Sequence, residues 1–317
     1  MTARVVLHLP PRMIEVFNGP RPPLLYNRIR QTLQAHGADV VLRPELATRD
    51  AQSIDDGDLH IVENGRIQRA GFLNAATAYL EGFFHVDPQG VQAASSISAL
   101  PYDPETIDQS SANAYLAALQ QRFSLPRHSR YKQPRASITL PADAIAVFLQ
   151  GPAPQRNGQA FCRYDDMLRA VCEAADGRPV VVKPHPLKPD HGLEIIEKIR
   201  AEGFAPITTA ANVHDILAAA AVTVSVNSAA CLEGFLHGKP AVLFGRSDFH
   251  HFVETVQTPA AFPAALARAL TTPRNDARAL FWYLGQHCLD ITASSFDARL
   301  LAIFATAGFD ANRLGLH

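Results

Sequence analysis

Short apolar runs alternate with segments of helical spacing along most of the chain. In the first 124 residues, apolar runs rich in Val, Leu and Ile predict strands, and two segments of helical spacing predict helices. The predicted strands are 4–9, 38–44 and 58–65, and the predicted helices are 22–37 and 106–124. Residues 71–90 are less regular and predict a helix followed by an aromatic-rich turn or strand.

The alternation restarts after residue 142 and is more regular there. Strands are predicted at 144–151, 179–186, 222–228 and 240–245, and helices at 164–177, 192–204, 213–221 and 229–238. This order is typical of βαβ units in a mainly parallel sheet. We therefore predict an α/β protein of two Rossmann-like domains whose parallel sheets face a central cleft. The predicted boundaries are 1–130 for the N-terminal domain, 131–290 for the C-terminal domain and 291–317 for helices that pack back on the N-terminal domain.

Between the two halves lies a segment of different composition, residues 124–142, which we call the basic segment. It contains three prolines and a run of cations before any acidic residue: Arg127, Arg130, Lys132, Arg135, and His128 when protonated. The simplest interpretation is a solvated interdomain linker. The alternative is a surface that contacts an anionic acceptor or a lipid headgroup.

Composition narrows the class of protein. The net charge of −1 gives no overall field that would favour nucleic acid, so no nucleic-acid partner is predicted. The four cysteines are far apart in the sequence, which is typical of a reduced, cytosolic protein. The N-terminus resembles neither a signal peptide nor a membrane span. We expect a cytoplasmic protein, at most peripherally associated with the inner face of the plasma membrane.

Two motifs follow predicted strands of the C-terminal half, where ligands bind in open parallel sheets. In "VVVKPHP", Pro184 and Pro186 restrict the backbone on both sides of His185, so the imidazole leaves the strand end in a limited range of directions. A histidine aimed into a cleft can donate to a phosphate or act as an acid, although most single histidines are structural.

The second motif is "VTVSVNSAACLEGFLHG", residues 222–238. Asn227 and Ser228 are suited to cap a helix that begins at Ala229, and Gly238 is suited to end it. A helix N-terminus binds anions through its free amides and its dipole. Glu233, one turn into the helix, could accept hydrogen bonds from ribose hydroxyls. An ordinary capped helix would have the same sequence. The motif therefore indicates a binding site mainly because it occurs together with the first motif.

Together, "FLQG", "VVVKPHP" and "VTVSVNSAACLEGFLHGKPAVLFGRSDFH" resemble the C-terminal half of the capsule polysaccharide biosynthesis family. The resemblance covers about residues 145–255, and only 78–90 of the N-terminal half share it, weakly. That family includes GT-B glycosyltransferases that use CMP-linked 3-deoxy-D-manno-octulosonic acid (Kdo). The resemblance implies a metal-independent transferase with no cofactor, an N-terminal domain for a glycan or glycolipid acceptor, and a C-terminal domain for a nucleotide-sugar donor, CMP-sugars being favoured.

The resemblance also implies roles for matching residues. His185 and Gln150 would be catalytic, with Gln150 ending the strand that faces the donor sugar. The implied donor-binding residues are Lys183, Pro186, Asn227, Ser228, Ala229 and Glu233. The chain departs from the family where an aspartate nucleophile follows the glutamine four residues later: Pro154 stands there. The departure leaves open the donor sugar, a retaining or inverting outcome, and any role for the nearby Asp165 and Asp166.

Alternatives remain from other classes. A teichoic-acid-type polyol-phosphate transferase also carries a basic-x-His-Pro strand end, but typically has Asp-Tyr-Ser-Ser where residues 225–228 read "SVNS". A non-catalytic protein that binds a nucleotide sugar or glycan would explain Pro154. The sequence "HHFVE" places His250 and His251 at helical spacing from Glu254 but lacks a third ligand, so no metal site is predicted. The phosphate-binding loops of ATP and dinucleotide enzymes are absent from the sequence.

Overall fold

The computed structural model describes residues 2–317 and divides them into two compact units. Unit 1 contains the chain up to Leu100 together with Tyr283–His317, and unit 2 contains Pro101–Trp282. The first boundary therefore lies earlier than the predicted one at residue 130, and the C-terminal return to unit 1 begins before residue 291. The basic segment belongs to unit 2 and is not a linker between the units. Its hydrogen bonds explain why, since Arg127 donates to Asp215 within unit 2.

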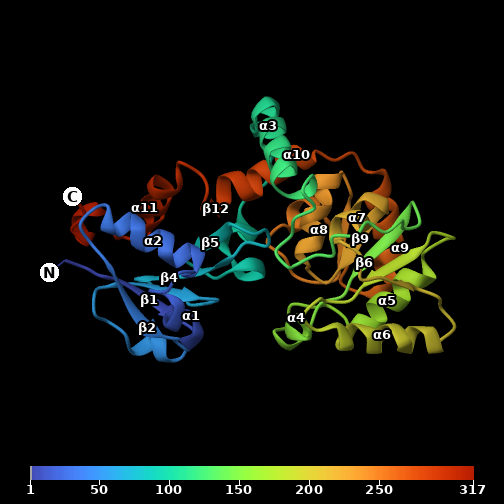
Figure 1. Cartoon of the computed structure of the whole chain (residues 1–317), viewed down its shortest axis with the longest axis horizontal. Helices are drawn as coiled ribbons and strands as arrows, with labels where there is room; N and C mark the ends of the chain where they lie inside the picture. Colours follow the sequence, from blue (N-terminus) through green and yellow to red (C-terminus); the bar gives the residue numbers. More distant parts are fainter. Residues whose placement is uncertain (1) are drawn as a thin grey trace. The chain divides into compact units, whose positions relative to one another are not determined.

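Unit 1 is built on a six-stranded sheet in the order β12-β5-β4-β3-β1-β2 (Figure 1). Neighbouring pairs among β1 to β4 are parallel, whereas β5 is antiparallel to β4 and β12 is antiparallel to β5. The strands are β1 (Val5–Leu9), β2 (Val40–Pro44), β3 (Leu59–Glu63), β4 (Phe72–Thr77), β5 (Phe83–Asp87) and β12 (Leu289–Asp290). The helices of this unit are α1 (Pro11–Val16), α2 (Leu24–Gln34), α11 (Phe296–Thr306) and α12 (Ala311–Leu314).

The predicted helix at the start of residues 71–90 is wrong. These residues form β4 and β5, joined by a short turn. The sequence of β4, "FLNAAT", has residues of good helix propensity, but β4 lies between β3 and β5 and is buried over almost its whole length. Burial between two neighbouring strands outweighs an intrinsic preference of a few tenths of a kcal/mol per residue.

The C-terminal helix α11 completes the core of unit 1. Phe296, Leu300 and Phe304 project from one side of it and are fully buried among residues of β1, β3 and α2. The three positions follow the i, i+4, i+8 spacing of a single helix face. Unit 1 is therefore assembled from the two ends of the described chain.

Unit 2 is built on a six-stranded sheet in the order β11-β10-β9-β6-β7-β8, and every recorded pairing in it is parallel. The strands are β6 (Ala144–Phe148), β7 (Val180–Lys183), β8 (Ile207–Thr208), β9 (Ala220–Ser225), β10 (Ala241–Leu243) and β11 (Glu254–Thr255). The helices are α3 (Gln109–Leu119), α4 (Ala153–Arg156), α5 (Tyr164–Glu173), α6 (Pro189–Ala201), α7 (Val213–Ala219), α8 (Ala229–Gly234), α9 (Phe262–Thr271) and α10 (Asp276–Leu280).

Side chains of the strands point alternately to the two faces of this sheet, and each face contributes to a separate hydrophobic core. Val182 and Val224 belong to the core that includes residues of α5, α6 and α9, while Val181 belongs to the core that includes residues of α7 and α8. Because successive side chains point to opposite faces, Lys183 and Ser225 lie on the α7/α8 face. The two strands that flank β6, namely β7 and β9, thus present polar residues to that face at their carboxyl ends.

The predicted α/β architecture, with two Rossmann-like units and mainly parallel sheets, is confirmed. Among residues 2–317, no helix combines the length and the apolar character needed to cross a membrane.

A pair of core substitutions tests the division into units. Phe296 in unit 1 and Phe262 in unit 2 are both fully buried, and replacing either by Ala should destabilise its own unit by about 3–5 kcal/mol. Hydrogen exchange followed by peptide mass spectrometry should show Phe296→Ala accelerating exchange in β1 and β3, and Phe262→Ala accelerating it in β6 and β9. Equal loosening of both units by Phe296→Ala would contradict the division.

Candidate functional site

Three neighbouring strands of unit 2 bring the predicted residues to one edge of the sheet. Strand β6 pairs with β9 on one side and β7 on the other, and Phe148 lies in register with both Ser225 and Lys183. Because the strands are parallel, the residues that follow them emerge at the same edge. Gln150 follows β6, His185 follows β7 and Asn227 follows β9.

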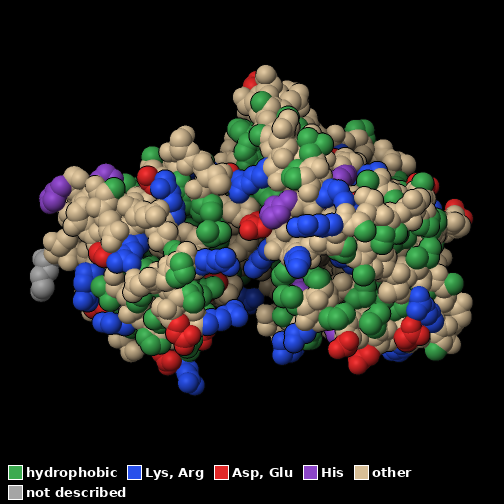
Figure 2. Space-filling model, viewed as in Figure 1, with side chains coloured by type: hydrophobic (Ala, Val, Ile, Leu, Met, Phe, Trp, Pro, Cys, Tyr) green, Lys and Arg blue, Asp and Glu red, His purple; other side chains and the backbone are tan. Residues whose placement is uncertain are grey.

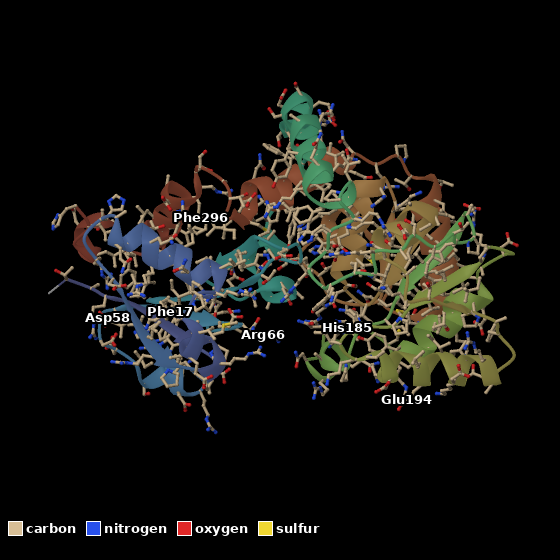
Figure 3. The ribbon with its side chains drawn as sticks, in the orientation of Figure 1. Phe17, Asp58, Arg66, His185, Glu194 and Phe296 are labelled. Carbon is tan, nitrogen blue, oxygen red and sulfur yellow. The ribbon has the colours of Figure 1, made fainter. Side chains whose placement is uncertain are left out.

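His185 is half-buried and held in one orientation by its surroundings (Figure 3). Its Nδ1 accepts a hydrogen bond from the backbone N–H of Leu187 at 3.2 Å, which leaves the proton of the neutral ring on Nε2. No group among residues 2–317 is hydrogen-bonded to Nε2. The ring contacts that of Tyr131 edge to face, with 5.1 Å between centroids. Burial, aided by the charge of Arg130, lowers the pKa of His185, so the neutral ring with a free Nε2–H donor is favoured.

The strand end that holds His185 is fixed by helix α6 as well as by its prolines. Gly192 of α6 packs directly on Pro184, and a Cβ at position 192 would lie 2.8 Å from the Cβ of Pro184. Only a glycine allows this approach. Pro186, on the other side of the imidazole, is exposed to solvent.

Gln150 and Asn227 are bonded to each other. The Gln150 Nε2 donates to the Asn227 side-chain oxygen at 3.0 Å, and the Asn227 backbone N–H donates to the Gln150 Oε1 at 3.0 Å. The Asn227 Nδ2 also donates to the carbonyl of Arg246 at 2.9 Å. Both amides are therefore used to join the ends of β6 and β9, which suits a positioning role.

Ser228 caps α8, as predicted. Its Oγ accepts from the N–H of Ala230, and its own N–H donates to the Oγ of Ser225 at 2.8 Å. The N–H of Ala229 has no partner among residues 2–317, so this one amide at the start of the helix is free to bind a ligand. Gly238, with a φ of +67°, ends the 3-10 turn that follows α8, which confirms the predicted stop.

Lys183 is directed away from solvent. Only 9% of it is exposed, and its Nζ donates to the carbonyls of Ala211 at 2.5 Å and Ala210 at 3.4 Å. Burial lowers its pKa. A direct contact with a donor phosphate would require these bonds to be given up.

Glu233 is buried in α8 rather than displayed on its surface. Only 4% of the residue is exposed, and its carboxylate is hydrogen-bonded to the hydroxyl of Ser129. Burial raises its pKa to about 7, against the opposing effect of that hydrogen bond. The carboxyl group is thus partly protonated near neutral pH. Its hydrogen-bond partner, Ser129, belongs to the basic segment.

The basic segment is the part of the site that the motifs did not identify. Ser129 contacts Glu233 and Tyr131 contacts His185, and these two segment residues are only two positions apart. Two residues of extended chain span at most about 7 Å, so the segment brings the surroundings of His185 and Glu233 together. The sequence feature that could have indicated a role for the basic segment is its run of cations without an acidic residue. A solvated linker accounts for the same feature equally well.

The carboxylates near Pro154 are engaged in ion pairs. Pro154 is buried in the short helix α4, and its carbonyl accepts from the N–H of Gln159 at 2.8 Å. Asp165 lies between Arg163 and Lys198, whose hydrogen bonds and charges hold its pKa far below the usual range despite burial. Asp166 pairs with Arg169 at 2.8 Å. Neither aspartate replaces the carboxylate that the resemblance implies at position 154.

The "HHFVE" residues are not gathered on one helix face. His250 bonds to the carbonyl of Ser247 through Nδ1 at 2.9 Å, and Glu254 pairs with Arg268 at 2.7 Å. Within residues 2–317, no group of three or more His, Cys, Asp or Glu side chains is arranged to hold a metal ion.

A cavity of about 610 Å³ lies elsewhere in unit 2, beside the first turns of α5 and α6. Its walls include Cys162, Tyr164, His191 and Lys198. None of the residues predicted for the site lines it. This cavity is separate from the residues that follow β6, β7 and β9, namely Gln150, His185 and Asn227 with its neighbours, which we call the strand-end site.

Unit 1 contains a second polar cluster that the sequence did not single out. His8 and His60, on adjacent strands, are joined by a bond between Nε2 and Nδ1 of 3.0 Å, and the outer nitrogens contact the Pro44 carbonyl and Asp56. Both rings are buried, so the cluster stabilises the pairing of β1 with β3.

Comparison with known proteins gives structural but not sequence relatives. No model of a protein family and no curated protein sequence matches the chain. The structure of Thermosulfurimonas dismutans KpsC, β-Kdo 2,7 transferase, has a TM-score of 0.55 at 14% identity and covers 96% of this chain and 99% of that one. The β-Kdo 2,4 transferase of the same KpsC has a TM-score of 0.52 at 16% identity and covers 88% and 89%.

These similarities extend over most of both chains and confirm the predicted GT-B-like fold. They also confirm that this fold is similar to that of Kdo transferases, as the sequence resemblance predicts. At this identity the likeness concerns the fold alone.

The buried carboxyl group of Glu233 should make the stability of unit 2 depend on pH. Its folded pKa of about 7 lies above the ordinary value of 4.5, so the folded state binds the proton more tightly and stability falls as the pH rises between these values. Gln cannot ionise, so the free energy of unfolding of the Glu233→Gln variant should not show this decrease, which is on the order of 2–3 kcal/mol. Urea unfolding followed by fluorescence of Trp282, the single tryptophan, reports on unit 2.

The matched control is Glu194→Gln, which replaces an exposed glutamate of α6 (Figure 3). This variant should keep the pH dependence of the unmodified protein. If Glu233→Gln also keeps it, the carboxyl group is not buried as described.

Proposed function

We propose that the chain is a glycosyltransferase that uses a nucleotide-activated sugar, CMP-Kdo or a related CMP-sugar, in the synthesis of bacterial capsule or surface polysaccharide. The acceptor would be a glycan or glycolipid at the cytoplasmic face of the membrane, with peripheral association of the enzyme. The observation that carries the proposal is the placement of a free His185 Nε2–H and a free Ala229 N–H at one sheet edge of a fold similar to that of Kdo transferases.

The chemistry of this edge suits departure of a nucleotide phosphate. Transfer breaks the bond between the anomeric carbon and the phosphate oxygen, and negative charge develops on the leaving phosphate. His185 would donate from Nε2 to that phosphate, and the amide of Ala229 would give a second hydrogen bond. Such preorganised donors stabilise the transition state without a metal ion or cofactor. Gln150 and Asn227 would hold the strand ends in register, and Lys183 and Pro186 would shape the turn that carries His185.

A second candidate is a protein that binds a nucleotide sugar without turnover. The observation in its favour is Pro154, because the carboxylates nearest in sequence, Asp165 and Asp166, are held by cations. A retaining mechanism through a covalent intermediate would need another nucleophile. In an inverting mechanism the acceptor hydroxyl attacks the anomeric carbon directly as the phosphate leaves, and its proton passes to water, so no nucleophile from the protein is needed.

A panel assay separates the two candidates. The chain would be incubated with CMP-, UDP- and GDP-sugars and glycan acceptors, and thermal stability would be measured with CMP, UDP and GDP. The transferase predicts turnover of a CMP-sugar and stabilisation by CMP, since a ligand that binds the folded state raises its stability. Stabilisation without turnover supports the binding protein, and no response to any nucleotide contradicts both.

His185→Ala should abolish most turnover while leaving the fold nearly intact. The prolines and Gly192 hold the strand end whatever side chain lies between them, and the ring is half-buried. We expect turnover to fall roughly 10²–10³-fold and stability to fall by less than about 1–2 kcal/mol. His185→Gln, which restores an N–H donor, should recover part of the rate. Normal turnover in an Ala variant that unfolds early would show that His185 is structural.

A further inference from the structure

Three cations of the basic segment have no ionic partner. Arg130, Lys132 and Arg135 are exposed, and no acidic group among residues 2–317 pairs with any of them. Most other arginines of unit 2 are paired, including the adjacent Arg127, whose guanidinium is 2.6 Å from Asp215. Figure 2 shows Lys and Arg side chains gathered below α3 on the face in view. A local excess of positive charge of this kind, in a chain of net charge −1, attracts anions.

The backbone that carries these cations is fastened on both sides. Before Arg130, the carbonyl of His128 accepts from the Nε2 of His214 at 2.7 Å. After it, the side chain of Gln133 accepts from the N–H of Val213 at 3.0 Å, and the carbonyl of Pro134 accepts from Asn212 at 3.2 Å. All three partners lie at the start of α7. The backbone that carries the cations is therefore held against unit 2. A ligand that binds these cations does not have to order a flexible linker, so it avoids that entropic cost.

This fastening places Arg130 beside His185. The ring of Tyr131, the next residue, packs on the imidazole at 5.1 Å. The guanidinium carbon of Arg130 lies 5.7 Å from the centroid of that Tyr131 ring, and the charge of Arg130 contributes to the lowered pKa of His185. The acidic group recorded at this part of the segment, Glu233, is buried and bonded to Ser129. An anion bound beside the Nε2 of His185 would lie within reach of both the cation and the imidazole donor.

We propose that Arg130 and the Nε2 of His185 bind the phosphate of a nucleotide, and that Lys132 and Arg135 add positive charge along the same fastened segment. The nucleotide would be the donor, and in this respect the proposal rests on the proposed function; recognition of phosphate by these residues does not require that function. Phosphate is favoured because its oxygens can accept from several N–H donors at once. A lipid phosphate has the same chemistry but must reach the partly buried imidazole from a membrane surface.

The test compares a variant that lacks three cations of the proposed site with a control variant that lacks three cations elsewhere in unit 2. The site variant is Arg130→Gln, Lys132→Gln and Arg135→Gln combined. The control variant combines Arg178→Gln, Arg200→Gln and Arg268→Gln, three arginines of unit 2 whose recorded partners are Asp143, Glu197 and Glu254. Each variant lowers the net charge by three, from −1 to −4. Binding of pyrophosphate and of CMP would be measured by calorimetry, after circular dichroism has shown that each variant is folded.

The site variant should bind pyrophosphate and CMP about 10- to 100-fold more weakly than the unmodified protein, as expected for loss of several exposed charge contacts. The control variant should bind within about twofold, because its charges are distant from the site. Equal losses in both variants, or no binding of either pyrophosphate or CMP by the unmodified protein, would overturn the proposal. If the triple site variant does not fold, the single substitution Arg130→Gln serves, with a loss of about threefold expected.

A vesicle experiment distinguishes the two sources of phosphate. The unmodified protein and the site variant would be mixed with vesicles of phosphatidylglycerol or of phosphatidylcholine. Binding to phosphatidylglycerol vesicles that depends on the three cations, without binding of pyrophosphate or CMP, would assign the surface to a lipid and overturn the nucleotide assignment. Charge-dependent binding of pyrophosphate and CMP by a chain that turns over no nucleotide sugar would support this site while the proposed function fails.

Discussion

The parallel pairing of β9, β6 and β7 is the constraint on which the rest of the site depends. In register, it aligns Phe148 with Ser225 and Lys183, so the three strands end together and the segments beyond them emerge at one edge. The hydrogen bonds between Gln150 and Asn227 then join two of these segments. The third is fixed by two prolines and by the approach of Gly192 to Pro184. A site of this kind is rigid because it is carried by strand ends and not by long loops.

Buried polar groups next to this edge stabilise it in ways that differ from their expected roles. The ammonium group of Lys183 is bonded to two backbone carbonyls that precede α7, and the carboxyl group of Glu233 is bonded to Ser129. A buried polar group without a partner would be costly, so both interactions help hold the basic segment and the α7 region in place. The two residues thus act on the site through the backbone that they fix.

The sequence was most informative where a local rule decides the structure. Ser228 and Gly238 mark the ends of a helical segment through capping chemistry and a left-handed residue, and both were predictable. Strand β4 was not, because its buried position between two strands outweighs the helix preference of its residues. The position of the basic segment was also beyond the sequence, since its fastening depends on Asn212 and His214, which are distant in the chain.

The central claim is that a nucleotide phosphate binds at the strand-end site of unit 2. A crystal structure of the chain with CMP tests it most directly. The account predicts a phosphate within hydrogen-bonding distance of the His185 Nε2 and the Ala229 N–H, with at least one cation of the basic segment beside it. A CMP phosphate bound instead in the cavity lined by Cys162, His191 and Lys198, with His185 untouched, would contradict it.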